Sequence, residues 1–117
     1  MGVKRIVINI DTEDTSKAEK FYGDILGLEV LMDLGWIKTY GNENEKQVQI
    51  SFANQGGSGT GTPDMSIEVE DVDTIYHQMK KSGFKIEYGP VIEPWGVYRF
   101  YVRDPFNKLV NILSHIK

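Results

Sequence analysis

Three alternating polar side chains, Asp64, Ser66 and Glu68, give this 117-residue sequence its clearest chemical pattern. They share one face of a predicted strand, because side chains alternate along a strand with a period of two. If that face points inward, Glu68 is a carboxylate in an apolar groove. Desolvation there raises its pKa and suits it to proton transfer or to anchoring a cationic ligand. The alternative is an ordinary cross-strand ion pair of Glu68 with Arg99 or Lys38.

Few other groups in the sequence are suited to catalysis. The chain has no cysteine, which excludes disulfides, thiolate metal sites and cysteine nucleophiles. His77 falls opposite the apolar stripe of its predicted helix, so we expect it to face solvent. His115 lies near the end of the chain, on a tail where a catalytic base is poorly held. The glycine-rich run 56–61 opens no helix and precedes no Gly-Lys-Ser/Thr, which excludes a phosphate-binding loop.

Two tryptophans are the most informative aromatic residues. Trp36 and Trp95 each stand beside a glycine near the start of a predicted strand, at corresponding points of the two halves of the chain. A large ring at such a point can close the mouth of a binding cleft. It can equally fill the core, and the sequence leaves both interpretations open.

The elements that position these residues repeat along the chain. Apolar spacing predicts amphipathic helices over 14–26 and 71–82, and a glycine directly follows each of them, Gly27 and Gly83. Strands are expected at 4–10, 28–33, 36–40, 47–52, 65–70, 84–88, 97–103 and 109–113. The order is βαβββ twice, in modules of residues 1–53 and 64–117 joined by a flexible polar linker, 54–63. The sequence thus predicts one α+β domain over 1–117, with mixed sheets curled around a cleft and helices outside.

Composition limits the partners of such a domain. The sequence is 40% hydrophobic and 26% charged, with a net charge of −4, as expected for one compact soluble domain. The acidic balance and the lack of a Lys/Arg cluster exclude nucleic acid and anionic membranes as expected partners. No apolar run approaches the roughly 18 residues of a membrane span, and no secretion leader is recognisable. We therefore expect a cytoplasmic protein.

Four segments together carry a family resemblance: FYGDILGLEV at 21–30, MSIEVEDVD at 65–73, PWG at 94–96 and FYVRDPFNKLV at 100–110. They resemble the glyoxalase, bleomycin-resistance and extradiol-dioxygenase group, the vicinal oxygen chelate superfamily. The resemblance covers nearly the whole chain and implies the glyoxalase/bleomycin-resistance fold. It does not specify a reaction, because this fold hosts isomerases, lyases, dioxygenases and non-catalytic binding proteins.

The resemblance also implies a divalent metal held by His, Glu or Gln side chains from four strands, two in each module. It places those positions at Val7, Ile50, Asp64 and Asn111. Val7 and Ile50 have no donor atom, and a catalytic metal needs at least three protein donors. Asp64 supplies one carboxylate and Asn111 one weak amide oxygen. We therefore expect no metal and no other cofactor.

The lining of the expected cleft follows from strand alternation. If the tight turn 104–107 closes the last hairpin, Phe100 lies opposite Asn111 and Tyr98 opposite Leu113. Both aromatic rings then share the cleft face with Asn111. Together with the two aliphatic positions of the first module, they make the cleft apolar and aromatic, which suits a flat or apolar ligand. The alternative is that these side chains fill a dry core.

These observations favour a metal-independent small-molecule-binding protein of the bleomycin-resistance type over an enzyme. The resemblance implies a homodimer. Its cleft is expected to sequester an apolar or aromatic ligand, and this ligand can be cationic. The expected ligand contacts are Trp95, Phe100, Tyr98, Glu68, Asn111, Val7, Ile50, Asp64, Ser66 and Trp36. Two alternatives remain: a glyoxalase-like lyase, isomerase or dioxygenase with a divalent metal, and a non-catalytic scaffold or sensor whose cleft is filled.

Overall fold

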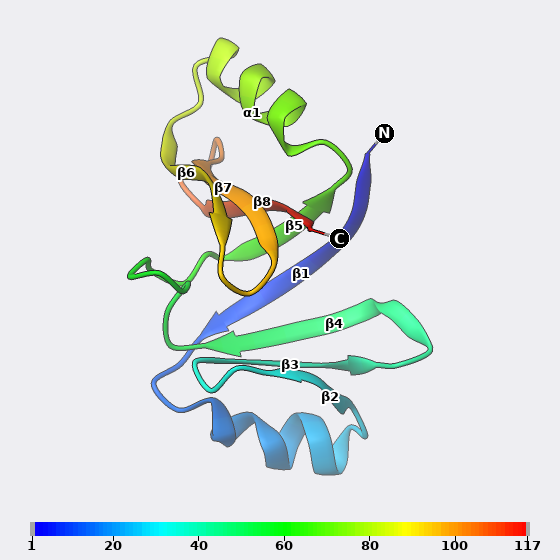
Figure 1. The fold of residues 1–117 in the computed structure, drawn as a ribbon. Coiled ribbons are helices and arrows are strands. Elements are labelled where there is room, and N and C mark those ends of the chain that lie inside the picture. Colours follow the sequence, from blue (N-terminus) through cyan, green and yellow to red (C-terminus); the bar gives the residue numbers. More distant parts are fainter. Residues whose placement is uncertain (1, 117) are drawn as a thin grey trace. The chain divides into compact units, whose positions relative to one another are not determined.

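The computed structural model describes residues 2–116, apart from the side chains of residues 45–47. Its elements are β1 (Val3–Asp11), η1 (Thr15–Ala18), η2 (Glu19–Ile25), β2 (Glu29–Asp33), β3 (Ile37–Asn42), β4 (Glu45–Ala53), β5 (Met65–Val69), α1 (Val72–Lys81), β6 (Ile86–Glu93), β7 (Val97–Arg103) and β8 (Leu109–His115). The βαβββ order occurs twice, which confirms the predicted α+β fold (Figure 1). Within the described residues, no helix is long and apolar enough to cross a bilayer.

The chain divides into two compact units. The N-terminal unit is Val7–Thr62, and the C-terminal unit combines Met1–Ile6 with Pro63–Lys117. Strand β1 therefore gives its first residues to the C-terminal unit and the others to the N-terminal unit. This division differs from the predicted modules at the first strand, and it groups most of the predicted linker with the N-terminal unit. The predicted cleft between the modules stays a prediction.

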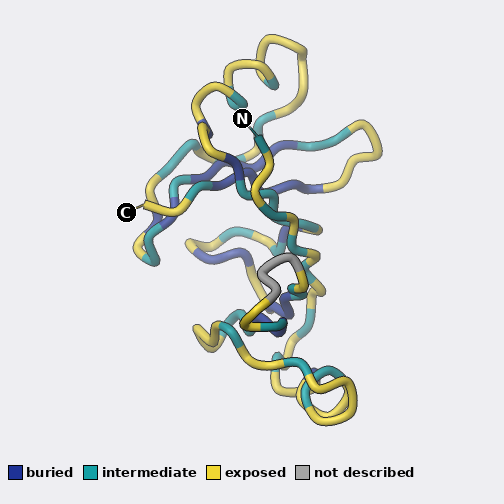
Figure 2. The backbone as a smooth tube through the Cα atoms, turned by 90° about the vertical axis from the view of Figure 1, so that its right-hand side faces the viewer, coloured by how far each residue is buried: buried dark blue, intermediate teal, exposed yellow. Residues whose placement is uncertain are grey.

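The C-terminal unit contains the larger core. Its sheet has the strand order β5-β8-β7-β6, with β5 and β8 parallel and the other neighbours antiparallel. Helix α1 lies over this sheet in Figure 1 and is capped by Asp71, whose carboxylate accepts a hydrogen bond from the Thr74 backbone N–H. Between helix and sheet lie the buried residues Val69, Val72, Phe100, Val102, Val110 and Ile112. Burial is concentrated in β7 and β8. Figure 2 shows the helix at its top as mostly exposed and buried segments along the strands below it.

The N-terminal unit has the strand order β2-β3-β4-β1, with β1 and β4 parallel. Its buried cluster consists of Ala18, Tyr40 and Phe52. The predicted α-helix over 14–26 is wrong in type: the segment is a 3₁₀ helix, η1, followed by a π-helix, η2. Wider π turns change the angular spacing of the side chains, so residues at helical intervals no longer share one stripe. Consequently Tyr22 packs on the cluster, whereas Ile25 remains exposed.

The predicted flexible linker has local structure. The Gly56 backbone N–H donates to the Thr60 carbonyl at 2.8 Å, and the Thr60 N–H donates back to Gly57 at 3.0 Å. Gly57 has a φ of 85°, a conformation that glycine adopts without strain. At the end of the segment, the Thr62 hydroxyl donates to Asp11 at 2.9 Å. Residues 54–62 thus form a hydrogen-bonded turn of the N-terminal unit.

Candidate functional site

The sheet of the C-terminal unit has two chemically different faces. One face packs on α1 through Phe100, Val102, Val110 and Ile112. Because strand side chains alternate, their neighbours in β7 and β8 point to the opposite side, which we call the helix-free face. Its polar and aromatic members are Ser66, Glu68, Tyr88, Glu93, Trp95, Arg99, Tyr101, Asn111 and His115. These residues form the candidate site, and all of them belong to one unit.

The predicted register of the last hairpin is wrong by one residue. Phe100 lies opposite Ile112, and Asn111 lies opposite Tyr101. The loop holds five residues rather than four, since the Asp104 N–H donates to the Lys108 carbonyl at 3.0 Å. A slip of one residue turns every side chain of a strand to the other face. The prediction that Phe100 and Asn111 lie on the same face of the sheet is therefore wrong.

The two aromatic residues affected by this register face α1. Phe100 is fully buried, and its ring centroid lies 5.4 Å from that of Tyr76 on the helix. The Tyr98 hydroxyl donates to the carboxylate of Asp73, at the start of α1, at 2.5 Å. That hydrogen bond, with burial and the negative charge, raises the pKa of Tyr98. Phe100 and Tyr98 thus join the helix to the sheet, and the assignment of both as ligand contacts, which relied on the register, loses its basis.

A buried ion pair lies at the centre of the helix-free face. The Arg99 Nη2 atom is 2.6 Å from Oε2 of Glu93, and both side chains are 3% exposed. Nε of Arg99 also donates to this oxygen, at 2.7 Å. The Tyr88 hydroxyl donates to Glu93 at 2.9 Å, and Nη1 of Arg99 donates to the Tyr101 hydroxyl at 2.8 Å. Buried charges persist only with such pairing and hydrogen bonding.

Three aromatic rings surround the Arg99 guanidinium. Its central carbon lies 4.8 Å from the ring centroid of Tyr101, 5.0 Å from Trp95 and 5.4 Å from Tyr88. These distances are within the range of cation–π attraction. This face is therefore aromatic and charged rather than apolar, and its rings are not the predicted pair, Phe100 and Tyr98. Sequence reasoning missed the Arg99 cluster, although an arginine inside the apolar strand 97–103 was a signal of a buried partner.

The turn between β6 and β7 places Trp95 against this cluster. The Gly96 N–H donates to the Glu93 carbonyl at 3.1 Å, and Gly96 has a φ of 88°. A glycine accepts this left-handed conformation, which an L side chain rarely adopts. The sequence PWG at 94–96 thus turns the chain sharply and holds the indole ring beside Arg99.

Asn111 and Ser66 form a second polar contact on this face. Nδ2 of Asn111 donates to the Ser66 hydroxyl at 3.1 Å. The carbonyl oxygen of the same amide is buried, with no hydrogen-bond partner among the described residues. A buried acceptor without a partner costs about 1–3 kcal/mol. The amide oxygen of Asn111 is therefore an unused hydrogen-bond acceptor among the described residues.

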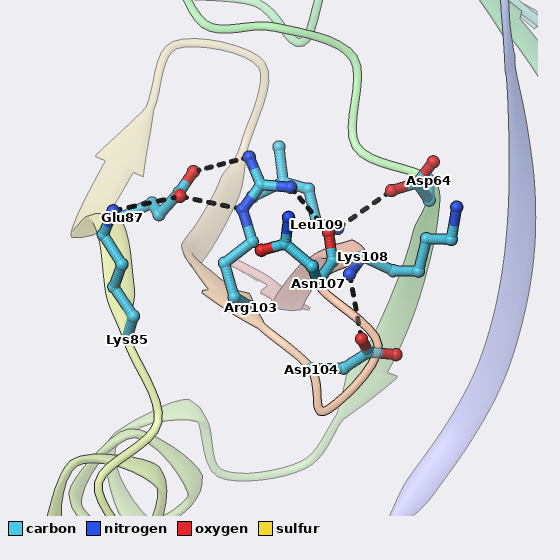
Figure 3. Close-up of polar contacts among 8 residues, drawn as sticks. All are labelled: Asp64, Lys85, Glu87, Arg103, Asp104, Asn107, Lys108 and Leu109. Carbon is cyan, nitrogen blue, oxygen red and sulfur yellow. Dashed lines mark hydrogen bonds and ion pairs between the residues drawn. The ribbon is translucent and has the colours of Figure 1, made fainter.

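Asp64 has a structural role. Its carboxylate accepts a hydrogen bond from the Leu109 backbone N–H at 2.8 Å, which ties the start of β5 to the start of β8 (Figure 3). Figure 3 also shows the adjacent turn, where Asp104 accepts from the Lys108 N–H at 2.9 Å. Beside it, Nε of Arg103 lies 2.8 Å from the Glu87 carboxylate. The Asp104 contact closes the five-residue loop, and the Arg103 contact joins β7 to β6.

The residues at the implied metal positions do not fit a catalytic metal. Ile50 packs on the cluster of Tyr40 and Phe52 and so lies on the opposite face of its sheet from Val7. The Asp64 carboxylate is engaged at the Leu109 N–H, and Asn111 offers only an amide oxygen. Within the described residues, no three His, Cys, Asp or Glu side chains are placed to hold a metal ion. We derive no metal chemistry from this donor set.

Glu68 has partners other than those predicted. Its Oε1 lies 2.8 Å from Nη2 of Arg5, and its Oε2 lies 3.0 Å from Nδ1 of His115. Burial alone raises the pKa of Glu68, but the His115 hydrogen bond and the Arg5 charge outweigh it, and the pKa is lowered. The predicted rise is therefore wrong. The predicted partners are wrong too, since Arg99 pairs with Glu93 and Lys38 lies 3.7 Å from Asp33.

The histidine predictions have different outcomes. His77 is exposed on α1, as expected. His115 is not on a loose tail: it is the last residue of β8 and lies opposite Val97 of β7. Its neighbour Ile116 donates its backbone N–H to the Gly96 carbonyl at 2.9 Å. The position of His115 in a paired strand escaped prediction because its hydrogen-bond partners are distant in sequence.

Trp36 belongs to the N-terminal unit. Its side chain is half-buried, and its carbonyl accepts from the Asn54 N–H at 3.0 Å. The helix-free side of this unit's sheet carries neutral polar groups, among them Thr39 and Ser51, whose hydroxyl oxygens lie 2.8 Å apart and are buried. A ligand-binding role for Trp36 stays a prediction.

Comparison with known proteins places these features in a family. The model described as Glyoxalase/Bleomycin resistance protein/Dioxygenase superfamily matches residues 4–112. Among solved structures, the chain is similar to an NAD-dependent benzaldehyde dehydrogenase from Legionella pneumophila, with a TM-score of 0.74, 18% identity and coverage of 94% of this chain and 98% of that one. Among curated protein sequences, no relative matches.

Two further structures share the fold. A glyoxalase/bleomycin resistance protein/dioxygenase superfamily member from Vibrio splendidus 12B01 has a TM-score of 0.68 and 15% identity, covering 97% of this chain and 99% of that one. Methylmalonyl-CoA epimerase from Mycobacterium tuberculosis has a TM-score of 0.67 and 15% identity, covering 99% of this chain and 89% of that one. At such identities, the likeness shows the fold alone.

Proposed function

Since the chain belongs to the glyoxalase, bleomycin-resistance protein and dioxygenase superfamily, we propose that it is a metal-independent small-molecule-binding member of the bleomycin-resistance type. The observation that carries this proposal is the composition of the helix-free face. Trp95 packs beside a neutralised Arg99, and Asn111 presents a buried amide oxygen without a partner among the described residues. An aromatic ligand with an N–H or O–H group matches both features.

The donor set supports a binding role over metal catalysis. Glyoxalase-like chemistry needs an ion with an open coordination position. At the implied positions the chain has an aliphatic residue, Val7, an engaged carboxylate, Asp64, and the weak amide oxygen of Asn111. A ligand held by burial, stacking and hydrogen bonds requires none of these as a metal donor.

Tryptophan fluorescence tests the proposal. In a Trp36→Phe background, Trp95 is the sole tryptophan, and titration with anilinonaphthalene sulfonate or bleomycin is expected to quench its emission. The matched Asn111→Leu variant removes the buried acceptor, so we expect affinity for the quenching probe to fall by about tenfold or more. Far-UV circular dichroism checks that the variant is folded.

Measuring the metal content of the purified protein tests whether its function is independent of metal. The protein purified without chelating resin is expected to contain no stoichiometric zinc, manganese, iron or nickel by inductively coupled plasma mass spectrometry. One bound ion per chain would overturn the metal-independent proposal and favour the lyase, isomerase or dioxygenase alternative.

The proposal includes a homodimer. Ile6, Ile8 and Ile10 alternate along β1 and are 50%, 50% and 41% exposed, which is unusual for large aliphatic side chains. A second copy of the chain is expected to cover them. Sedimentation analysis should give a dimer for the wild type and a monomer for Ile8→Glu. A monomeric wild type at micromolar concentration would remove the homodimer from the proposal.

A further inference from the structure

His115 and Glu68 have the geometry of an oriented general base. Nδ1 of His115 lies 3.0 Å from Oε2 of Glu68, whose side chain is 15% exposed. The imidazole itself is 52% exposed, so solvent and small molecules reach it. Enzymes orient a histidine for proton transfer in this way, with a carboxylate hydrogen-bonded to the ring nitrogen that does not react.

The protonation states in this pair follow from the surroundings of Glu68. Arg5 holds the other carboxylate oxygen at 2.8 Å, and its charge and the His115 hydrogen bond keep the Glu68 pKa below its ordinary value. An ionised carboxylate only accepts hydrogen bonds, so Nδ1 of His115 carries the hydrogen. In the neutral ring, the lone pair is then on Nε2. No hydrogen bond to Nε2 is present within residues 2–116.

Strand pairing places His115 on the helix-free face, at the end of β8. His115 is opposite Val97, which is opposite Glu93, so the three lie in one row across β8, β7 and β6. Leu113 and Arg99 form the adjacent row. Across a sheet, neighbouring strands lie about 4.8 Å apart, so the imidazole is one or two strands from the Arg99 cluster. A planar molecule beside Trp95 is within reach of this part of the face.

Charged groups near the pair come from each adjacent strand. Strand β1 contributes Lys4 and Arg5, both of which favour the charged form of Glu68. From β7 comes Arg99, which Glu93 of β6 neutralises. Among the described residues on this part of the face, Nε2 of His115 is therefore the one nitrogen available to accept a proton.

We infer that His115, oriented by Glu68, is a metal-independent general base for a planar conjugated acid bound on the helix-free face. Nε2 accepts a proton from a C–H or O–H group, and the electron pair of that bond remains with the substrate as an enolate or oxyanion. No oxidant, reductant or metal takes part. This inference rests on the proposed binding of a small molecule to the helix-free face and goes beyond it. The two can fail separately, because His115 and Glu68 differ from the residues that the Trp95 quenching experiment tests.

The tautomer of His115 is the first test. Nitrogen-15 chemical shifts at a pH where the ring is neutral should show hydrogen on Nδ1 of His115. The exposed His77 is the matched control and should show the Nε2–H form that free imidazole prefers. Glu68→Ala should return His115 to that form. Hydrogen on Nε2 of His115 in the wild type would overturn the inference.

Proton abstraction is the second test, with nitrobenzisoxazole as the probe. A base removes the ring C–H proton, the released pair completes a nitrile as the N–O bond breaks, and a coloured nitrophenolate forms. We expect His115→Gln to lower kcat/KM for this reaction by about 100-fold, the scale of general-base catalysis. His77→Gln should leave it unchanged. Equal rates for His115→Gln and the wild type would refute the role of His115 as a base.

Discussion

The two units share one topology but differ in the chemistry of their helix-free sheet faces. In the N-terminal unit, the buried polar contact on that face joins two neutral hydroxyls, Thr39 and Ser51. In the C-terminal unit, the equivalent face carries the Arg99–Glu93 ion pair at 2.6 Å and the Glu68–His115 pair at 3.0 Å. The difference indicates that the repeat supplies the scaffold, whereas side chains of the C-terminal unit supply the ion pairs on which the proposed binding and proton transfer rely.

The largest effect is expected from breaking the buried ion pair. Glu93→Ala leaves Arg99 as an uncompensated buried charge, which should lower the free energy of unfolding by about 3–5 kcal/mol. Urea unfolding followed by circular dichroism measures this. The control is Glu87→Ala at the exposed Arg103 contact, and its loss should be much smaller. Similar losses in the two variants would contradict the special status of the buried pair.

The hydroxyl contact of the N-terminal unit should matter less. Thr39→Val keeps the shape of the side chain but leaves the Ser51 hydroxyl buried without this partner, at a cost of about 1–3 kcal/mol. The double variant Thr39→Val/Ser51→Ala removes both polar groups and should recover most of that loss. A double variant less stable than Thr39→Val would indicate that the two hydroxyls have other essential contacts.

A substitution in the core of the N-terminal unit is expected to stabilise the protein. Tyr40 is 1% exposed, and its hydroxyl has no hydrogen-bond partner in the described part of the chain. Tyr40→Phe removes this unsatisfied group while keeping the ring beside Phe52, so we expect a gain of about 1 kcal/mol in unfolding free energy. Thermal unfolding measures the gain, and a lower melting temperature would mean that the hydroxyl is bonded in solution.

The smallest effect concerns pH. The folded-state pKa of Glu68 lies below its ordinary value of 4.5, so its stabilising contribution is complete above that value and is lost as the pH falls through the folded pKa. The stability difference between wild type and Glu68→Gln should therefore shrink in acid. The exposed Glu70→Gln is a matched control on the same segment. A difference that grows on acidification would reverse the sign and contradict the assigned contacts.

Sequence patterns predicted the elements better than their side-chain partners. Alternation and helical spacing located α1 and most strands, because these depend on nearby residues. The strand predicted at 84–88 is the exception, since β6 runs from Ile86 to Glu93. The β7–β8 register depended on whether the loop held four or five residues. Asn107 has a φ of 63°, which accommodates the longer loop. The one additional loop residue determines which face of the sheet Phe100 occupies.

The ion pairs escaped prediction for a different reason. Glu68 meets Arg5 and His115 from opposite ends of the sequence, and the composition of a strand does not specify partners so distant. Glu93 and Arg99 are close in sequence, but they share a face only because the three-residue turn 94–96 places Glu93 opposite Val97. The place of Trp95 beside a turn could be predicted because glycine next to tryptophan is a local signal, whereas its role as a ligand contact stays a prediction.

Strand β1 creates a dependence between the two ends of the chain. Its first residues group with the C-terminal unit, where β1 is the neighbour of β5, and Arg5 binds Glu68. Deleting residues 2–6 would therefore expose backbone donors and acceptors along β5, an open strand edge of the kind that recruits other chains into swapped or aggregated assemblies. A deletion at the N-terminus would thus cause misassembly through the C-terminal unit.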